Sequence, residues 1–214
     1  MHTWFATSRL EFVAFGLVAV GLSTLAGCSG RFAPPPVDPK AATNAALEQY
    51  DKNGDDAIDE EELAACPALR DALGEYDLNA DKKISREELG DRIERMYGRS
   101  ISLTAADCKV TLDRKALEGA RVLFIPEDFI GKGTTLSAEG VTDQVGFADI
   151  AVPADKLPEE LKRYRKMQVG FYRVEITHPS IEIPAKYNTN TELGYEVHPD
   201  SHGGSHVTFD LKSK

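Results

Sequence analysis

Two segments of this chain repeat one pattern of apolar, aromatic and acidic residues 26 positions apart. Residues 47–63 and 73–89 both read Leu-x-x-Tyr-Asp-x-Asn-x-Asp, then Ile, then Glu-Glu-Leu. The leading Leu and Tyr of each copy are three positions apart, so they lie on one face of a helix. Near the end of each copy, a side chain that can cap a helix precedes a Glu by three positions, which predicts a second helix. These capping pairs are Asp59 with Glu62, and Ser85 with Glu88.

Both segments resemble the EF-hand, a helix-loop-helix unit whose loop surrounds a calcium ion with oxygen ligands. The resemblance implies calcium as the cofactor and ligands at loop positions 1, 3, 5, 7, 9 and 12. In the first loop these are Asp51, Asn53, Asp55, the carbonyl of Ala57, Asp59 and bidentate Glu62. In the second loop they are Asp77, Asn79, Asp81, the carbonyl of Lys83, Ser85 and Glu88. Ile58 and Ile84 are expected to pair as a short β-bridge between the loops. The alternative is two acidic helical segments that repeat only as solvated faces.

The residue at loop position 6 departs from the EF-hand pattern. Glycine is usual there because the backbone needs a positive φ, whereas this chain has Asp56 and Lys82. A left-handed conformation costs a non-glycine residue on the order of 1 kcal/mol, and Asp adopts it more readily than Lys. The first loop also has one more acidic ligand than the second, which has Lys82 and Lys83 close by. We therefore expect the first loop to bind calcium first, and occupancy of both loops stays open.

The N-terminal region has the pattern of an export signal. Residues 12–22 form an apolar run that is shorter than the ~20 residues of a membrane-spanning helix. The run is followed by Leu25-Ala26-Gly27-Cys28, which resembles the lipobox of bacterial lipoproteins. The resemblance implies removal of residues 1–27 and a diacylglycerol on Cys28, and the alternative is an ordinary signal peptide with a chance cysteine. Residues 28–39 contain four prolines and are predicted to be an extended tether.

Beyond about Ala106 the pattern changes to short β-like runs between turn residues, with one polar helical insert predicted at 156–166. Seven runs in the segment 106–214 favour a β-sandwich. The predicted strands are 110–112, 121–125, 141–152, 170–177, 181–183, 193–197 and 207–211.

Short motifs in this half resemble the carboxypeptidase regulatory-like, or transthyretin-like, domains of bacterial surface lipoproteins. They are Val110-Thr-Leu-Asp, Gly119-Ala120-x-Val122-x-Phe124-x-Pro126-Glu127, Gly140-Val-Thr-Asp143 and Gly170-x-Tyr172-x-Val174. The segment Ile183-Pro-Ala-Lys-Tyr-Asn188 is similar to planctomycete lipoproteins of this type, some of which carry an EF-hand pair. The resemblance implies a non-catalytic accessory module. The expected fold class is α+β, with a small helical EF-hand pair at 40–99 followed by an all-β transthyretin-like sandwich at 106–214.

The charge of the chain indicates which kind of partner it binds, and its cysteines indicate which covalent links it can form. A net charge of −10 argues against nucleic acid as a partner. Residues 40–99 contain 16 Asp and Glu against 9 Lys and Arg, a balance that suits a bound cation. If Cys28 is acylated, Cys66 and Cys108 remain. In an oxidising compartment they form either a disulfide or two buried free thiols, and the sequence leaves both open.

Three other sequence features resemble binding sites, but each has a simpler structural interpretation. His198, His202 and His206 have a spacing that could bind a transition metal, but the neighbouring glycines and Asp200-Ser201 favour a solvated hairpin loop. Gly131-Lys-Gly-Thr lacks the remainder of a phosphate loop. The basic residues between 162 and 166 could contact anionic head groups, although a solvated helix face is the simpler interpretation. The sequence has no nucleophile elbow, zincin motif or dinucleotide-binding motif.

These features together predict an exported, calcium-binding protein that is lipid-anchored at the cell envelope, in the periplasmic or cell-surface leaflet. Its expected role is non-catalytic binding or scaffolding, with an envelope protein or polysaccharide as partner. The alternative is an envelope enzyme or transport accessory that uses the β-rich domain.

Overall fold

Five helices lie between residues 39 and 97 of the computed structural model, which describes residues 1–2, 33–99, 101–198 and 204–214. In the described residues they are α1 (Pro39–Tyr50), α2 (Glu60–Leu63), α3 (Pro67–Asp71), α4 (Leu73–Tyr76) and α5 (Arg86–Tyr97). The side chain of Asp38 caps α1 by accepting a hydrogen bond from the Ala41 amide, and Pro67 occupies the first turn of α3, where its missing N–H costs nothing. None of these helices has the length and apolar character needed to cross a membrane. The predicted lipid attachment at Cys28, and the predicted signal peptide apart from its first two residues, lie outside the described residues.

The strands form three sheets in the part of the chain that the structure describes. The smallest pairs β1 (Ala57–Ile58) with β2 (Ile84–Ser85). The second contains β3 (Ala106–Leu112), β4 (Lys115–Ala116), β7 (Phe147–Asp149) and β10 (Ser205–Leu211). The third has the order β6 (Ala138–Val141), β5 (Arg121–Pro126), β8 (Gly170–Thr177) and β9 (Leu193–Val197). All pairings are antiparallel except β10 with β3, which run parallel from Ser205 opposite Ala106 to Leu211 opposite Leu112.

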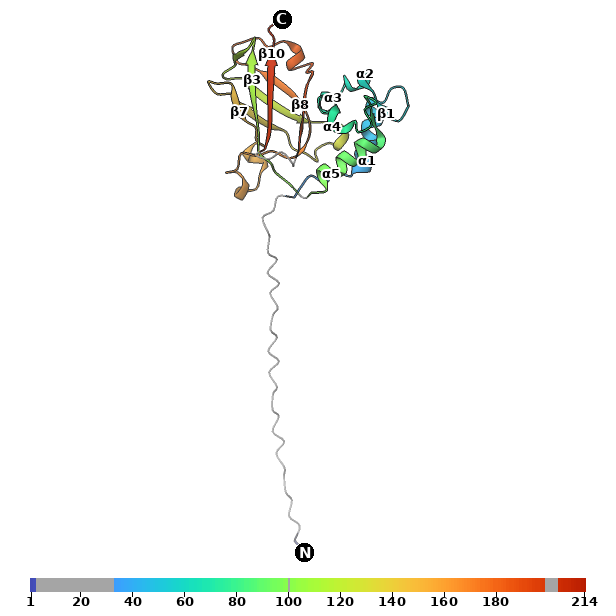
Figure 1. Ribbon diagram of the computed structural model, residues 1–214. Coiled ribbons are helices and arrows are strands. Elements are labelled where there is room, and N and C mark those ends of the chain that lie inside the picture. The colour runs from blue at the N-terminus through green and yellow to red at the C-terminus, as the bar shows by residue number, and fades with distance from the viewer. Residues whose placement is uncertain (3–32, 100, 199–203) are drawn as a thin grey trace. The chain divides into compact units, whose positions relative to one another are not determined.

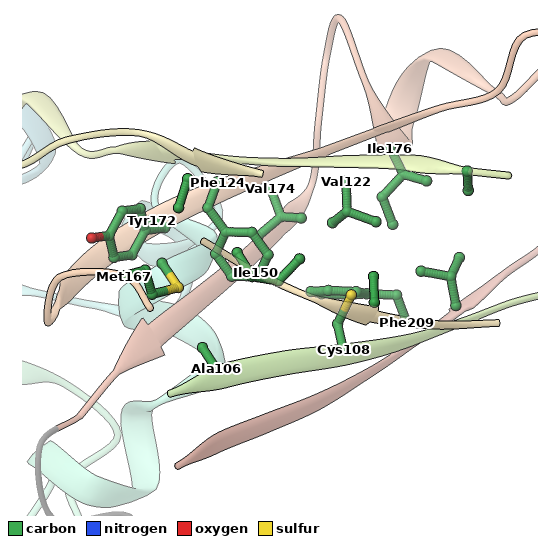
Figure 2. Close-up of a cluster of buried hydrophobic side chains, with 14 of the residues drawn as sticks. Ala106, Cys108, Val122, Phe124, Ile150, Met167, Tyr172, Val174, Ile176 and Phe209 are labelled. Atoms are coloured by element: carbon green, nitrogen blue, oxygen red, sulfur yellow. The ribbon is translucent and has the colours of Figure 1, made fainter. Parts of the chain in front are cut away.

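The two larger sheets bury one hydrophobic cluster between them (Figure 2). Alternate residues of β8 point into it, because successive side chains of a strand face opposite sides of the sheet. From the other sheet, Cys108 and Phe209 face the same cluster. The β8 residues in this cluster are Tyr172, Val174 and Ile176.

A second hydrophobic cluster joins the helices to the opposite face of the third sheet. Phe171 of β8 and Phe129 of the 3₁₀ turn η1 (Asp128–Ile130) lie in one cluster with side chains of α1, α3 and α5. Helix α3 packs on β9, and Figure 1 shows α1 to α5 grouped on one side of β3, β8 and β10. This contact is close because Gly194 of β9 has no side chain, and a Cβ there would lie 2.2 Å from the Ala68 nitrogen. Helices and sheets therefore share a core, and the described residues from 33 onward belong to one compact unit.

The predicted fold, a helical EF-hand pair followed by an all-β transthyretin-like sandwich, is wrong. The described chain is mixed α+β, mostly strands in three sheets with five short helices. The helix leaving the first acidic loop, α2, and the helix entering the second, α4, each have only four residues. Pro67 begins a separate helix between them that packs on β9. The apolar side chains of the helices therefore pack against the third sheet. The prediction had instead treated the helices and the strands as two separate, successive modules.

Several predicted elements also differ. The predicted strand 141–152 contains only the last residue of β6, then a turn at Gly146, where φ is 79°, and then the three residues of β7. Residues 181–183 lie in irregular structure. In place of the predicted helix at 156–166, the structure has the end of one 3₁₀ turn, η2 (Ala154–Lys156), then a second, η3 (Glu159–Leu161), and irregular backbone. Pro158 has no N–H to continue the first turn. A fourth 3₁₀ turn, η4, spans Ala185–Tyr187.

Candidate functional site

The two acidic loops lie side by side. The first loop, 51–62, connects α1 to α2, and the second, 77–88, connects α4 to α5. Ile58 pairs with Ile84 in an antiparallel bridge, and both side chains are fully buried. The predicted β-bridge is therefore confirmed, and it places the candidate ligands of both loops on neighbouring stretches of backbone.

Within each loop, the side chains at positions 1, 3 and 5 accept hydrogen bonds from amides of the same loop. Asp51 accepts from Gly54 at 2.6 Å and from Asp56 at 3.0 Å. In the second loop Asp77 accepts from Asp81 at 3.0 Å and from Lys82 at 2.8 Å. The remaining acceptors are Asn53 and Asp55 in the first loop, and Asn79 and Asp81 in the second. The two loops therefore fold in the same way locally.

The backbone at loop position 6 is left-handed in both loops. The φ angle is 67° at Asp56 and 64° at Lys82. This is the conformation that glycine usually supplies in such a loop. Both residues adopt it, and the strain of about 1 kcal/mol expected for a non-glycine residue falls on Lys82 more than on Asp56.

The glutamates at position 12 close the loops. Glu62 accepts hydrogen bonds from the amides of Lys52 at 2.7 Å and Asn53 at 3.1 Å through Oε1, and from Asp59 at 2.9 Å through Oε2. Glu88 accepts from Leu78 and Ser85 in the same manner. Asp59 and Ser85 cap α2 and α5, and both predicted capping boxes are confirmed.

The candidate ligands match the chemistry of calcium, a hard cation that prefers carboxylate and carbonyl oxygens. In the structure, however, the side chains at positions 1, 3, 5 and 12 accept hydrogen bonds from amides of their own loops. Among the described residues, no group of three or more His, Cys, Asp or Glu side chains is arranged to hold a metal ion. Binding calcium would exchange amide partners for the ion.

Two basic side chains of the second loop pair with acids of the first. Lys83 Nζ lies 2.5 Å from Asp55 Oδ2, and Arg86 lies 2.6 Å from Asp56 Oδ1. The hydrogen bond from Lys83 lowers the pKa of Asp55, and the one from Arg86 lowers the pKa of Asp56. Asp55 is an expected ligand whereas Asp56 is not, so the two ion pairs affect the candidate site differently.

The tyrosine that precedes each loop donates a hydrogen bond to a buried carboxylate. Tyr76 donates to Glu196 Oε2 at 2.5 Å, and Arg92 binds Glu196 Oε1 at 2.6 and 3.0 Å. Tyr50 donates to Glu127 Oε2 at 3.4 Å. Burial raises the pKa of Glu127 to about 7. Neither carboxylate was predicted from the sequence, where the only signal for them was the Tyr that directly precedes each loop.

Cys66 and Cys108 are free thiols. Cys66 lies in the cluster below the helices and Cys108 in the cluster between the larger sheets. Burial raises the pKa of each thiol to about 12. The structure thus has the second of the two arrangements that the sequence left open, and the disulfide is not formed.

The histidines have separate partners. His178 Nε2 lies 2.9 Å from the Glu118 carbonyl oxygen, and His206 Nδ1 lies 2.5 Å from Asp107 Oδ2. His198 lines a cleft of about 520 Å³ together with Glu75 and Tyr195, and burial lowers its pKa to about 4. His202 lies outside the described residues. Among the described residues, His178, His198 and His206 belong to no group of side chains arranged to hold a metal ion.

Comparison with known proteins adds little. No protein family model and no curated protein matches this sequence. One similar solved structure is a DUF3823 family protein from Parabacteroides merdae ATCC 43184, with 12% sequence identity and a TM-score of 0.30. The match covers 51% of this chain and 45% of that one. Similarity at this level supports no conclusion about fold or function.

Proposed function

We propose that this chain is a calcium-binding protein, anchored at the cell envelope through a lipid on Cys28, with a non-catalytic role in binding or scaffolding. The observation that carries the proposal is the left-handed backbone at Asp56 and Lys82. Two residues that disfavour this conformation adopt it at the same position of both loops, where a calcium-binding loop needs it. Residue type, spacing and backbone conformation thus agree in two copies.

The ligand set favours calcium over magnesium. Each loop offers three or four carboxylates together with side-chain and carbonyl oxygens, and Ca²⁺ accepts six to eight such ligands in flexible geometry. Magnesium prefers six ligands in strict octahedral order and usually keeps several waters. Thiols and imidazoles, which softer metals prefer, are not among the candidate ligands of the loops.

A scaffolding role agrees with how the loops are joined to the rest of the chain. The tyrosine before each loop bonds a carboxylate from beyond residue 100, either Glu127 or Glu196. An ion that orders the loops would therefore stabilise the contact between helices and sheet. The proposed partner is an envelope protein or polysaccharide, with the lipid holding the protein at the membrane.

Titration calorimetry of the full chain tests calcium binding and the expected order of filling. Glu62→Gln should abolish the tighter phase and Glu88→Gln the weaker one, because each removes the bidentate ligand of one loop. Glu60→Gln is the matched control, because this neighbouring side chain is exposed and is not an expected ligand. If Glu88→Gln removes the tighter phase, the ranking of the loops is reversed. If wild type binds no calcium, the proposal fails.

Intact-mass measurement of the membrane-extracted protein tests the anchor. The wild type should lack residues 1–27 and carry added acyl mass, whereas Cys28→Ser should not be acylated. Cys108→Ser is the control, because it also removes one thiol but leaves Cys28 in place. Detection of residues 1–27 in a mature wild-type chain without acyl mass would rule out the lipid anchor.

A further inference from the structure

The side chain of Lys83 extends from the second loop to the ligands of the first. Its Nζ lies 2.5 Å from Asp55 Oδ2, and each side chain is 38% exposed. The charges of Asp55, Asp59 and Asp81 all act on this ammonium group. Two of those carboxylates, Asp55 and Asp59, are expected ligands of the first loop, so the positive charge of Lys83 acts on the groups that would bind calcium there.

The backbone explains why Lys83 reaches the neighbouring loop. Ala57 pairs with Ser85, and Ile58 with Ile84, in antiparallel register. Continuing that register brings Lys83 opposite Asp59, and its long side chain then extends back to Asp55. The short sheet that aligns the two loops therefore also places the ammonium group of Lys83, in the second loop, beside Asp55 of the first.

We propose that the Lys83 ammonium is a tethered cation that competes with calcium for the first loop, so that its release from Asp55 regulates filling of that loop. This inference rests on the proposed calcium-binding function. The carbonyl of Lys83 is at the same time an expected ligand of the second loop. The side chain of Lys83 would thus oppose calcium binding in the first loop, and its backbone carbonyl would favour calcium binding in the second.

The neighbouring basic residues do not fill this role. Arg86 binds Asp56, which occupies position 6 and is not an expected ligand. The Lys82 side chain forms no ion pair among the described residues. Lys82 therefore provides a control that lies one residue away, has the same charge and is exposed.

Calorimetric calcium titration of the full chain, comparing Lys83→Gln with Lys82→Gln, tests the inference. Each variant removes one positive charge from the second loop and keeps the backbone carbonyl. Lys83→Gln should tighten the phase that Glu62→Gln abolishes by about three- to tenfold, the range expected for losing an exposed, partly screened charge contact. Lys82→Gln should change that phase by less than about twofold.

The outcomes separate this inference from the proposed function. Equal tightening by the two variants, or tightening only of the phase that Glu88→Gln abolishes, overturns the competition by Lys83 and leaves calcium binding intact. Absence of calcium binding in wild type and in both lysine variants overturns the proposed function and the inference with it.

Discussion

The contact between α3 and β9 depends on a single glycine, and Gly194→Ala tests it. A Cβ at residue 194 would lie 2.2 Å from the Ala68 nitrogen and 2.4 Å from the Pro67 carbonyl carbon. Both atoms are backbone, so no side-chain rotation can relieve the clash. Helix α3 would have to move by about 1 Å to reach the 3.4 Å of an ordinary contact. That movement also strains the hydrogen bond from Arg70 to the Glu192 carbonyl.

The expected cost follows from overpacking a rigid contact. Inserting a methyl group into a well-packed core costs about 1–3 kcal/mol, and the upper end applies because both partners are backbone. For a chain of this length, about 3 kcal/mol lowers the melting temperature by about 6–12 °C. The loss should appear in thermal unfolding followed by circular dichroism, and in urea unfolding as a lower midpoint.

Gly74→Ala is the matched control. A Cβ at residue 74 meets nothing within 4 Å, and Ala is favoured over Gly within a helix by about 0.5–1 kcal/mol. This variant should unfold at the wild-type temperature or slightly above it. If Gly194→Ala is as stable as Gly74→Ala, α3 does not pack on β9 in solution and the shared core is described incorrectly.

Three further predictions concern buried groups. Arg92→Met leaves the Glu196 carboxylate buried without its cation and should cost about 3–5 kcal/mol in urea unfolding, whereas an unchanged midpoint would contradict the buried ion pair. Burial raises the pKa of Glu127 from 4.5 to about 7, so the folded state retains a proton that the unfolded state releases, and stability should fall as pH rises from about 4.5 to 7. In Glu127→Gln, the unfolding free energy should no longer fall with pH over this range. A variant whose unfolding free energy falls as steeply as that of wild type would contradict the assignment of this effect to Glu127. Alkylation of the denatured, unreduced protein should label both Cys66 and Cys108, and labelling of neither would indicate a disulfide.

Local spacing in the sequence was sufficient to predict the two loops. The bridge between Ile58 and Ile84, and the capping boxes of Asp59 and Ser85, involve groups that are adjacent in the chain or in equivalent copies of the repeat. Other hydrogen bonds within each loop join residues two to five apart, and those from Lys52 to Glu62 and from Leu78 to Glu88 span ten positions. Such contacts depend on sequence separation, so a repeated pattern predicts them directly.

Contacts between distant residues were decided only by the tertiary structure. Tyr76 and Glu196 are 120 positions apart, and Tyr50 and Glu127 are 77 apart. Sequence spacing carries no information about such pairs, because they depend on how the helical segment lies against the sheet. The predicted fold failed for the same reason. The hydrophobic pattern identified apolar faces on the short helices, but only packing determined that they cover the third sheet, where Gly194 leaves room for the backbone of α3.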